Sequence, residues 1–157
     1  MNRFQTRIRE VGFFVQSKLD KYVVFNNDRY TRILIEDTNE YQIVMMCWKR
    51  GHITPIHDHN YSGCWMTVLK GCVQEKLYSA DTLEHIQTHW YKYPDLDYID
   101  NMIGFHQIES LDDETVTLHL YAPPIRELMV YDPKNNTSVI QNMTFDVINN
   151  WSVLPQE

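Results

Sequence analysis

The chain has 157 residues, of which 43% are hydrophobic and 13% aromatic, and its formal net charge at pH 7 is −7. This composition is typical of a globular protein and not of a disordered one, and the length suits a single domain with a real core. The negative charge and the lack of a basic cluster argue against a nucleic-acid or anionic-membrane partner.

Cysteine usage and the N-terminal sequence indicate a reducing compartment. The three cysteines, Cys47, Cys64 and Cys72, are odd in number and lack the spacing of a zinc site. No apolar run approaches the length of a transmembrane helix, and the first residues lack the apolar core of a signal peptide. We therefore expect a cytoplasmic protein without a membrane partner. We also expect a monomer.

The expected elements are one helix followed by many short strands. Residues 4–18 are loosely amphipathic and predict a helix, although Gly12 is unfavourable within it. After the turn at residues 26–28, the pattern alternates strand-like runs with turn-forming residues. The expected strands are 31–36, 41–48, 64–70, 72–78, 85–91, 98–100, 105–109, 115–121, 128–131 and 138–147. Such a series predicts an all-β sandwich or barrel.

The first expected strand contains an arginine whose direction is open. Arg32 shares a strand face with Leu34, opposite Ile33 and Ile35. It could therefore point into the interior, although arginines on edge strands usually meet water.

Two histidines follow the second expected strand. His57 and His59 are two residues apart, and residues i and i+2 of a strand point to the same side. Neutral imidazole is a common ligand of first-row metals, so both rings could bind one ion. A complete site needs at least one further ligand from elsewhere in the chain. A bare pair of this kind could also be chance, or two surface histidines in a turn.

The strand at 115–121 alternates without interruption. One face is aliphatic, with Val116, Leu118 and Leu120. The other face carries a hydroxyl, an imidazole and a phenol, from Thr117, His119 and Tyr121. An ordinary strand would expose this second face to solvent, whereas a barrel could turn it into an interior cavity lined by a hydrogen-bonded relay.

The remaining histidines, cysteines and tyrosines have simpler interpretations. We expect a turn or surface location for His52, His85 and His89. We expect Cys47 and Cys72 to be small core residues. Tyr91, Tyr93 and Tyr98 are expected to pack on the outside of the sheets.

The spacing of Gly51, His57, His59, Cys64 and Gly71 resembles the first motif of the cupin superfamily, with Cys64 where most metal-binding cupins carry a glutamate ligand. This departure resembles the cysteine dioxygenase type I family, whose iron has only histidine ligands. Segments in the family's order support the resemblance, which covers about residues 30–145: 29–34, 46–48, 56–59, 103–109, 117–124 and 143–145. The N-terminal segment is shorter than is usual in the family, and residues 103–106 lack the proline and spacing of the general cupin second motif.

The resemblance implies a fold and a metal site. The fold would be a cupin, a small jelly-roll β-barrel or sandwich with a short N-terminal helical segment. We expect a single cupin domain over residues 1–157, with a helical cap at 1–28, the barrel at 29–147 and a C-terminal tail at 148–157. The metal would be Fe(II), bound by His57, His59 and His106.

The resemblance also implies roles for residues around the metal. Arg32, with Tyr30 nearby, would bind the substrate carboxylate. Cys64 and Tyr121 would be joined by a thioether cross-link, a cofactor derived from the protein itself, and Tyr121 would also contact substrate. His119 would orient Tyr121. Thr117 stands where a serine is usual in the animal enzymes, and Trp48 would lie beside the pocket.

The implied activity is dioxygenation of the thiol of L-cysteine by O₂ to cysteine sulfinate, a step of cysteine catabolism toward taurine and sulfate. The partners would be L-cysteine and O₂. Another thiol dioxygenase, acting on 3-mercaptopropionate or cysteamine, is the nearest alternative, but Arg32 and Cys64 favour cysteine because the mercaptopropionate enzymes usually lack both. A cupin that binds metal without turnover is the alternative from another class.

Overall fold

A computed structural model describes residues 1–149 of the chain. The N-terminal helix α1 spans Arg3–Gln16, close to the expected 4–18, and a short α2 at Leu19–Tyr22 follows it. Asn2 begins α1 with a capping box: its side chain accepts from the backbone of Phe4 and Gln5, and the Gln5 side chain accepts from the Asn2 backbone. None of the described helices is long and apolar enough to cross a membrane.

The strands of the described region follow as a long β series. Their bounds are β1 (Thr31–Asp37), β2 (Gln42–Trp48), β3 (Ile56–His57), β4 (Gly63–Lys70), β5 (Cys72–Tyr78), β6 (His85–Lys92), β7 (Leu96–Ile99), β8 (Phe105–Ser110), β9 (Thr115–Ala122), β10 (Glu127–Asp132), β11 (Thr137–Asn142) and β12 (Val147–Ile148). The expected all-β class with an N-terminal helix is confirmed.

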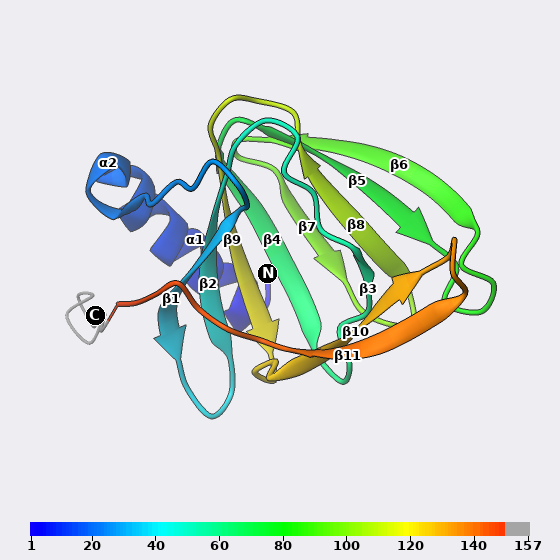
Figure 1. The fold of residues 1–157 in the computed structure, drawn as a ribbon. Coiled ribbons are helices and arrows are strands. Elements are labelled where there is room, and N and C mark those ends of the chain that lie inside the picture. Colours follow the sequence, from blue (N-terminus) through cyan, green and yellow to red (C-terminus); the bar gives the residue numbers. More distant parts are fainter. Residues whose placement is uncertain (150–157) are drawn as a thin grey trace.

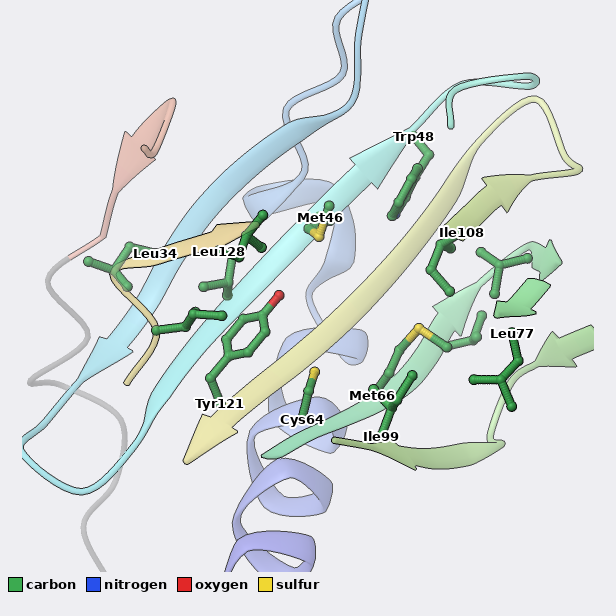
Figure 2. Close-up of a cluster of buried hydrophobic side chains, with 14 residues drawn as sticks. Leu34, Met46, Trp48, Cys64, Met66, Leu77, Ile99, Ile108, Tyr121 and Leu128 are labelled. Carbon is green, nitrogen blue, oxygen red and sulfur yellow. The ribbon is translucent and has the colours of Figure 1, made fainter. Parts of the chain in front are cut away.

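The strands form two six-stranded sheets that face each other (Figure 1). One sheet has the order β12-β1-β2-β9-β4-β7 and the other β11-β10-β3-β8-β5-β6. The helix α1 packs on the outer face of the first sheet, and its buried face includes Ile8, Val11 and Val15. A second apolar cluster fills the space between the sheets, as Figure 2 shows around Met46, Met66 and Ile108.

Two glycines have clear structural reasons. Gly12, unfavourable for a helix on propensity, lets α1 approach the sheet, because an added Cβ would lie 3.3 Å from the Leu69 side chain. Gly71 turns the chain between β4 and β5 with a φ of +79°, which glycine adopts without strain. An added Cβ there would also lie 2.8 Å from the Glu114 carbonyl oxygen.

Two expected strands differ from the structure, and one observed strand was not expected. The expected strand 138–147 is divided, because β11 pairs with β10 in one sheet whereas β12 pairs with β1 in the other. The residues between them form a strap from sheet to sheet, fixed where the Asp146 backbone donates to the Arg32 carbonyl. The strand expected at 98–100 begins earlier, as β7, because it pairs with β4. The short β3 was not expected at all.

The described residues form one two-sheet unit. The assignment of a single domain to residues 1–157 stays a prediction, and most of the expected tail at 148–157 lies outside the described residues.

Candidate metal centre and its pocket

Three histidines from separate parts of the chain converge between the sheets. His57 ends β3 and is paired in register with His106 on β8, while His59 follows in the next loop. One ring nitrogen of each lies within 4.8 Å of the others. His59 is not on a strand, so the strand periodicity that suggested the pair does not explain it. Asn101 holds the loop, accepting from the His59 backbone at 2.8 Å and donating to the Asn60 carbonyl at 2.9 Å.

Hydrogen bonds show which nitrogen of the His57 ring and of the His106 ring carries the proton. His57 Nδ1 lies 2.9 Å from the Pro55 carbonyl oxygen, and His106 Nδ1 lies 2.8 Å from a Glu75 carboxylate oxygen. Both oxygens are acceptors, so each Nδ1 carries the proton and each Nε2 presents a lone pair. The two Nε2 atoms lie 3.1 Å apart. Two facing lone pairs at this distance repel each other unless a cation lies between them.

Burial keeps these imidazoles neutral. It lowers the pKa of His57, and lowers the pKa of His59 and His106 well below the usual range, with mutual repulsion of the rings adding to the effect in both. Metal ligation requires the unprotonated ring, so the cluster is ready to bind at neutral pH. Three nitrogen donors suit a first-row transition metal, and the residues therefore fit a metal centre.

The cluster opens into a pocket between the sheets. Besides the three histidines, the lining includes Tyr30, Arg32, Trp48, His119 and Tyr121, together with Gln141, Met143 and Thr144 from β11 and the strap. Tyr30 packs against Trp48 with ring centroids 4.7 Å apart. The pocket gathers residues from both sheets, which is why no single stretch of sequence displays it.

Arg32 lines this pocket and does not project into solvent. Its Nε donates to the Thr144 carbonyl at 3.1 Å, and Nη1 lies 4.0 Å from the Met46 sulfur. Within residues 1–149, Nη2 is buried and has no hydrogen-bond partner. A buried guanidinium nitrogen with no acceptor is costly unless a ligand supplies one, so the pocket is suited to an anionic group.

Strand β9 is buried on both faces. Its aliphatic face packs beneath α1, and its other face, with Thr117, His119 and Tyr121, looks into the space between the sheets. The interpretation of a solvent-exposed polar face is therefore wrong. The aliphatic face is covered by a helix and the polar face by the second sheet.

A buried hydrogen-bond chain links Trp48, Thr117 and His119. The Trp48 indole donates to the Thr117 hydroxyl at 2.9 Å, and that hydroxyl lies 2.8 Å from His119 Nε2. Indole only donates, so the hydroxyl accepts from Trp48 and is free to donate its own hydrogen to Nε2, an arrangement in which the ring proton of His119 is on Nδ1. His119 Nδ1 lies 4.0 Å from the Cys64 sulfur. The His119 and Tyr121 rings are nearly parallel, with their centroids 6.2 Å apart. His119 thus contacts both residues of the expected cross-link.

Cys64 and Tyr121 are both buried, at 2% and 6% exposure. Burial raises the pKa of the Cys64 thiol and of the Tyr121 phenol, so both are protonated at neutral pH. For Tyr121, the Arg32 guanidinium acts in the opposite direction. The Tyr121 ring also lies beside His59, with centroids 6.4 Å apart, which brings the phenol next to the histidine cluster.

Glu75 is the residue that sequence reasoning missed. It lies between Val73 and Leu77 on the inward face of β5 and is only 2% exposed. A lone acidic residue at the inward position of an alternating strand was the available signal. It contacts both His106 and His89, so His89 is not a simple surface histidine.

Several simpler expectations are met. His52 lies in a turn, where its Nδ1 accepts from the Lys49 backbone at 3.0 Å. His85 lies on the exposed edge strand β6, where it contacts Thr88 and the edge of the Tyr78 ring. Cys47 is fully buried in the core, as expected. Cys72 is partly exposed, so the expectation of a core position is wrong for this residue. Tyr98 packs on Trp65 on the outside of the first sheet, with ring centroids 4.6 Å apart.

Comparisons with known proteins agree with this geometry. The profile of the family "Cysteine dioxygenase type I" matches residues 15–134. Cysteine dioxygenase type 1 of Homo sapiens is 30% identical over 132 residues, covering 79% of this chain and 66% of the relative. The enzyme of Danio rerio is 28% identical over 142 residues, covering 80% and 67%. The chain thus spans just under two thirds of the length of the first of these relatives.

Solved structures show the same fold. An RmlC-like cupin protein from Desulfovibrio desulfuricans aligns with a TM-score of 0.55 and 23% identity, covering 67% of this chain and 92% of that chain. A protein with a double-stranded β-helix domain from Klebsiella pneumoniae aligns with a TM-score of 0.57 and 16% identity, covering 80% and 95%. The expectation of a cupin fold is confirmed.

Proposed function

The chain belongs to the cysteine dioxygenase type I family, and on this premise we propose that it oxidises the thiol of L-cysteine to the sulfinate. The reaction consumes one O₂, both atoms of which end on sulfur, and no other oxidant is needed. The observation that carries the proposal is the meeting, in one pocket, of a three-histidine cluster with an arginine whose Nη2 donor is buried and unused among residues 1–149.

We assign Fe(II) as the metal, held by His57, His59 and His106. When bound, ferrous iron supplies oxygen activation and a Lewis acid that lowers the pKa of a substrate thiol. The three neutral imidazoles leave the full charge of the ion to be balanced by an anionic substrate. Burial keeps the rings unprotonated, so the ligand set is available at neutral pH.

Arg32 would bind the substrate carboxylate. Support comes from Nη2, which is buried in the pocket and has no partner among residues 1–149. The Thr144 carbonyl fixes Nε and so orients the guanidinium. A charged hydrogen bond of this kind contributes about 1.5–3 kcal/mol, which favours a thiol that carries a carboxylate. Tyr30 shares the pocket and would contact the same end of the substrate.

Tyr121 would donate a hydrogen bond to substrate or oxygen, with His119 as its orienting neighbour. Burial raises the pKa of Tyr121, so the phenol keeps the proton that a donor needs. Cys64 and Tyr121 would form the thioether bond that locks the ring. A preorganised donor of this type stabilises developing charge without reorganisation at the moment of reaction.

The size of the pocket favours a small substrate. Its free volume is about 50 Å³, comparable to a few water positions. A small amino acid matches this space better than a peptide thiol does. Cysteamine and 3-mercaptopropionate are also small, so Arg32 and the substrate amine must decide among them. We retain the cytoplasmic location and the monomeric state as predictions.

The test is turnover of the iron-loaded protein with L-cysteine under ¹⁸O₂. We expect cysteine sulfinate carrying two labelled oxygens, identified by mass spectrometry. If cysteamine or 3-mercaptopropionate is turned over faster than L-cysteine, that thiol, and not L-cysteine, is the substrate. Iron binding without oxygen uptake on any of the three thiols would identify a metal-binding cupin without turnover.

A further inference from the structure

A buried carboxylate lies directly behind the metal cluster. Glu75 Oε2 lies 2.8 Å from His106 Nδ1, and Oε1 lies 3.1 Å from His89 Nδ1. The Glu75 side chain is 3% exposed and the His106 side chain 6% exposed. Taking a carboxylate out of water costs several kcal/mol unless it is well paired. Among residues 1–149, its contacts within salt-bridge distance are these two imidazoles, and no lysine or arginine forms an ion pair with it.

We propose that Glu75 is a positioning residue that fixes His106 as an Nε2 ligand and supplies, from behind that ligand, the negative charge that an all-histidine set lacks. The inference rests on the function proposed above only in taking the cluster as an iron centre. It assigns no contact between Glu75 and substrate.

The hydrogen bond explains the orientation of the ligand. With its Nδ1 proton held by Glu75, His106 directs the Nε2 lone pair toward the cluster, where it lies 3.1 Å from His57 Nε2. His57 is fixed by a neutral acceptor, the Pro55 carbonyl. Within residues 1–149, His59 Nδ1 has no hydrogen-bond partner, so of the three histidines only His106 has an anionic one there. A carboxylate behind an imidazole ligand fixes the tautomer and raises the basicity of the ligating nitrogen.

A role for the negative charge of Glu75 explains why an acidic residue occupies an inward position of β5, between Val73 and Leu77. Iron sites that activate oxygen often combine two histidines with a carboxylate ligand. Here the carboxylate is one imidazole further from the metal position. It should strengthen binding of the cation and stabilise the ferric state more than the ferrous state, because the attraction grows with the charge of the ion. Removing the charge should therefore raise the reduction potential.

Two further polar groups, Asp97 and Tyr91, face the buried Glu75 side chain. Asp97 lies on β7, the edge strand of the first sheet. Burial, and after it repulsion from Glu75, raises the pKa of Asp97 to about 6. Tyr91 also faces this group, and burial followed by Glu75 and Asp97 raises its pKa. Two acidic groups in one buried region are unfavourable for stability, so folding alone does not explain Glu75.

The test separates the charge from the hydrogen bond. Glu75→Gln keeps an acceptor for His106 but removes the charge, whereas Glu75→Ala removes both. For Glu75→Ala we expect anaerobic Fe(II) affinity, measured against a competing chelator, to fall about 10- to 100-fold. For Glu75→Gln we expect a smaller loss of affinity together with a higher Fe(III)/Fe(II) potential. Both measurements are made without substrate, so they remain valid if L-cysteine proves not to be the substrate.

The matched control is Glu36→Gln. Glu36 is also a largely buried, paired carboxylate, but it binds Arg7 of α1 at 3.0 Å, outside the pocket. This variant should keep wild-type iron affinity and potential. If Glu75→Gln is folded by circular dichroism and matches the control in both quantities, the proposal is wrong.

A measurement on the wild-type protein covers the case in which the variants do not fold. In ¹⁵N-histidine-labelled, zinc-loaded protein, His106 should show a protonated Nδ1 and a metal-bound Nε2. A metal-bound Nδ1 would overturn the proposal.

Discussion

Cys64 and Tyr121 lie directly opposite each other on the neighbouring antiparallel strands β4 and β9 (Figure 2). Cross-strand partners have Cβ atoms about 4.5–5.5 Å apart, so a thiol and a phenol ring in this register are in reach of each other. Sheet pairing, and not chance contact, brings them together beside the histidine cluster.

This register leads to the first prediction, a thioether between Cys64 and Tyr121 that accumulates with turnover. Sulfur would bond to the ring carbon next to the hydroxyl, and the two hydrogens lost would reduce dioxygen. Denaturing gels should show a doublet, and mass spectrometry a linked peptide pair one hydrogen molecule lighter than the sum. Cys64→Ser should remove the doublet and reduce activity while retaining iron. A fully active protein with a free Cys64 thiol after many turnovers would contradict the cross-link.

The second prediction concerns His106. His106→Ala removes one of three nitrogen donors, so both bound iron and sulfinate formation should be lost. Metal content after loading, measured by elemental analysis, checks this. His85→Ala, at an exposed histidine that contacts Thr88, is the control and should retain both properties. Stoichiometric iron in folded His106→Ala would remove His106 from the ligand set.

The third prediction concerns Arg32. Arg32→Gln should raise the KM for L-cysteine by about 10- to 100-fold, the equivalent of losing a charged hydrogen bond. The KM for cysteamine, which has no carboxylate, should change far less. Arg126→Gln, which removes an exposed ion pair with Asp37, should affect neither. Equal losses on both thiols would make Arg32 a structural residue.

The fourth prediction concerns the hydroxyl between Trp48 and His119. Thr117→Val preserves shape but leaves the Trp48 indole and His119 Nε2 without their buried partner. We expect the free energy of unfolding to fall by about 1–3 kcal/mol, measured by urea denaturation. Thr117→Ser keeps the hydroxyl and should retain most of the stability. If Thr117→Val is as stable as the wild type, the hydroxyl and its two hydrogen bonds do not contribute to stability.

The fifth prediction concerns pH and Asp97. Its native pKa is raised to about 6 from 3.8, chiefly by burial, so the folded state holds a proton that the unfolded state has released between these values. Its contribution to stability therefore falls as pH rises from about 4 to about 6 and stays low above that. Asp97→Asn should remove this loss, making the variant more stable than wild type at pH 7.5 by about 1–2 kcal/mol, after allowance for partial exposure.

The comparison that checks it is urea denaturation of both proteins at pH 4.5 and pH 7.5. The stability advantage of Asp97→Asn should be small at the lower pH and largest at the higher one. An advantage that is independent of pH would show that Asp97 does not titrate in this range.

Local patterns in the sequence determined much of the molecule. Alternation placed the two faces of strand β9 correctly, because side chains of a strand point to opposite sides whatever lies beyond them. The motif around His57 and His59, with the segments resembling its family, led to the cupin fold and to three of the histidines that the structure gathers. Turn-forming residues located most strand ends.

Only the tertiary structure decided which polar groups are buried together. Strand periodicity was the wrong reason for pairing His57 with His59, since β3 ends at His57 and Asn101 holds the loop that follows. The strap after β11 crosses between sheets, and neither its division nor its contact with Arg32 can be read from local preference. Glu75 was missed for the same physical reason. Its meaning depends on His106, 31 residues away, and a sequence pattern records spacing along a chain but not contact across a core.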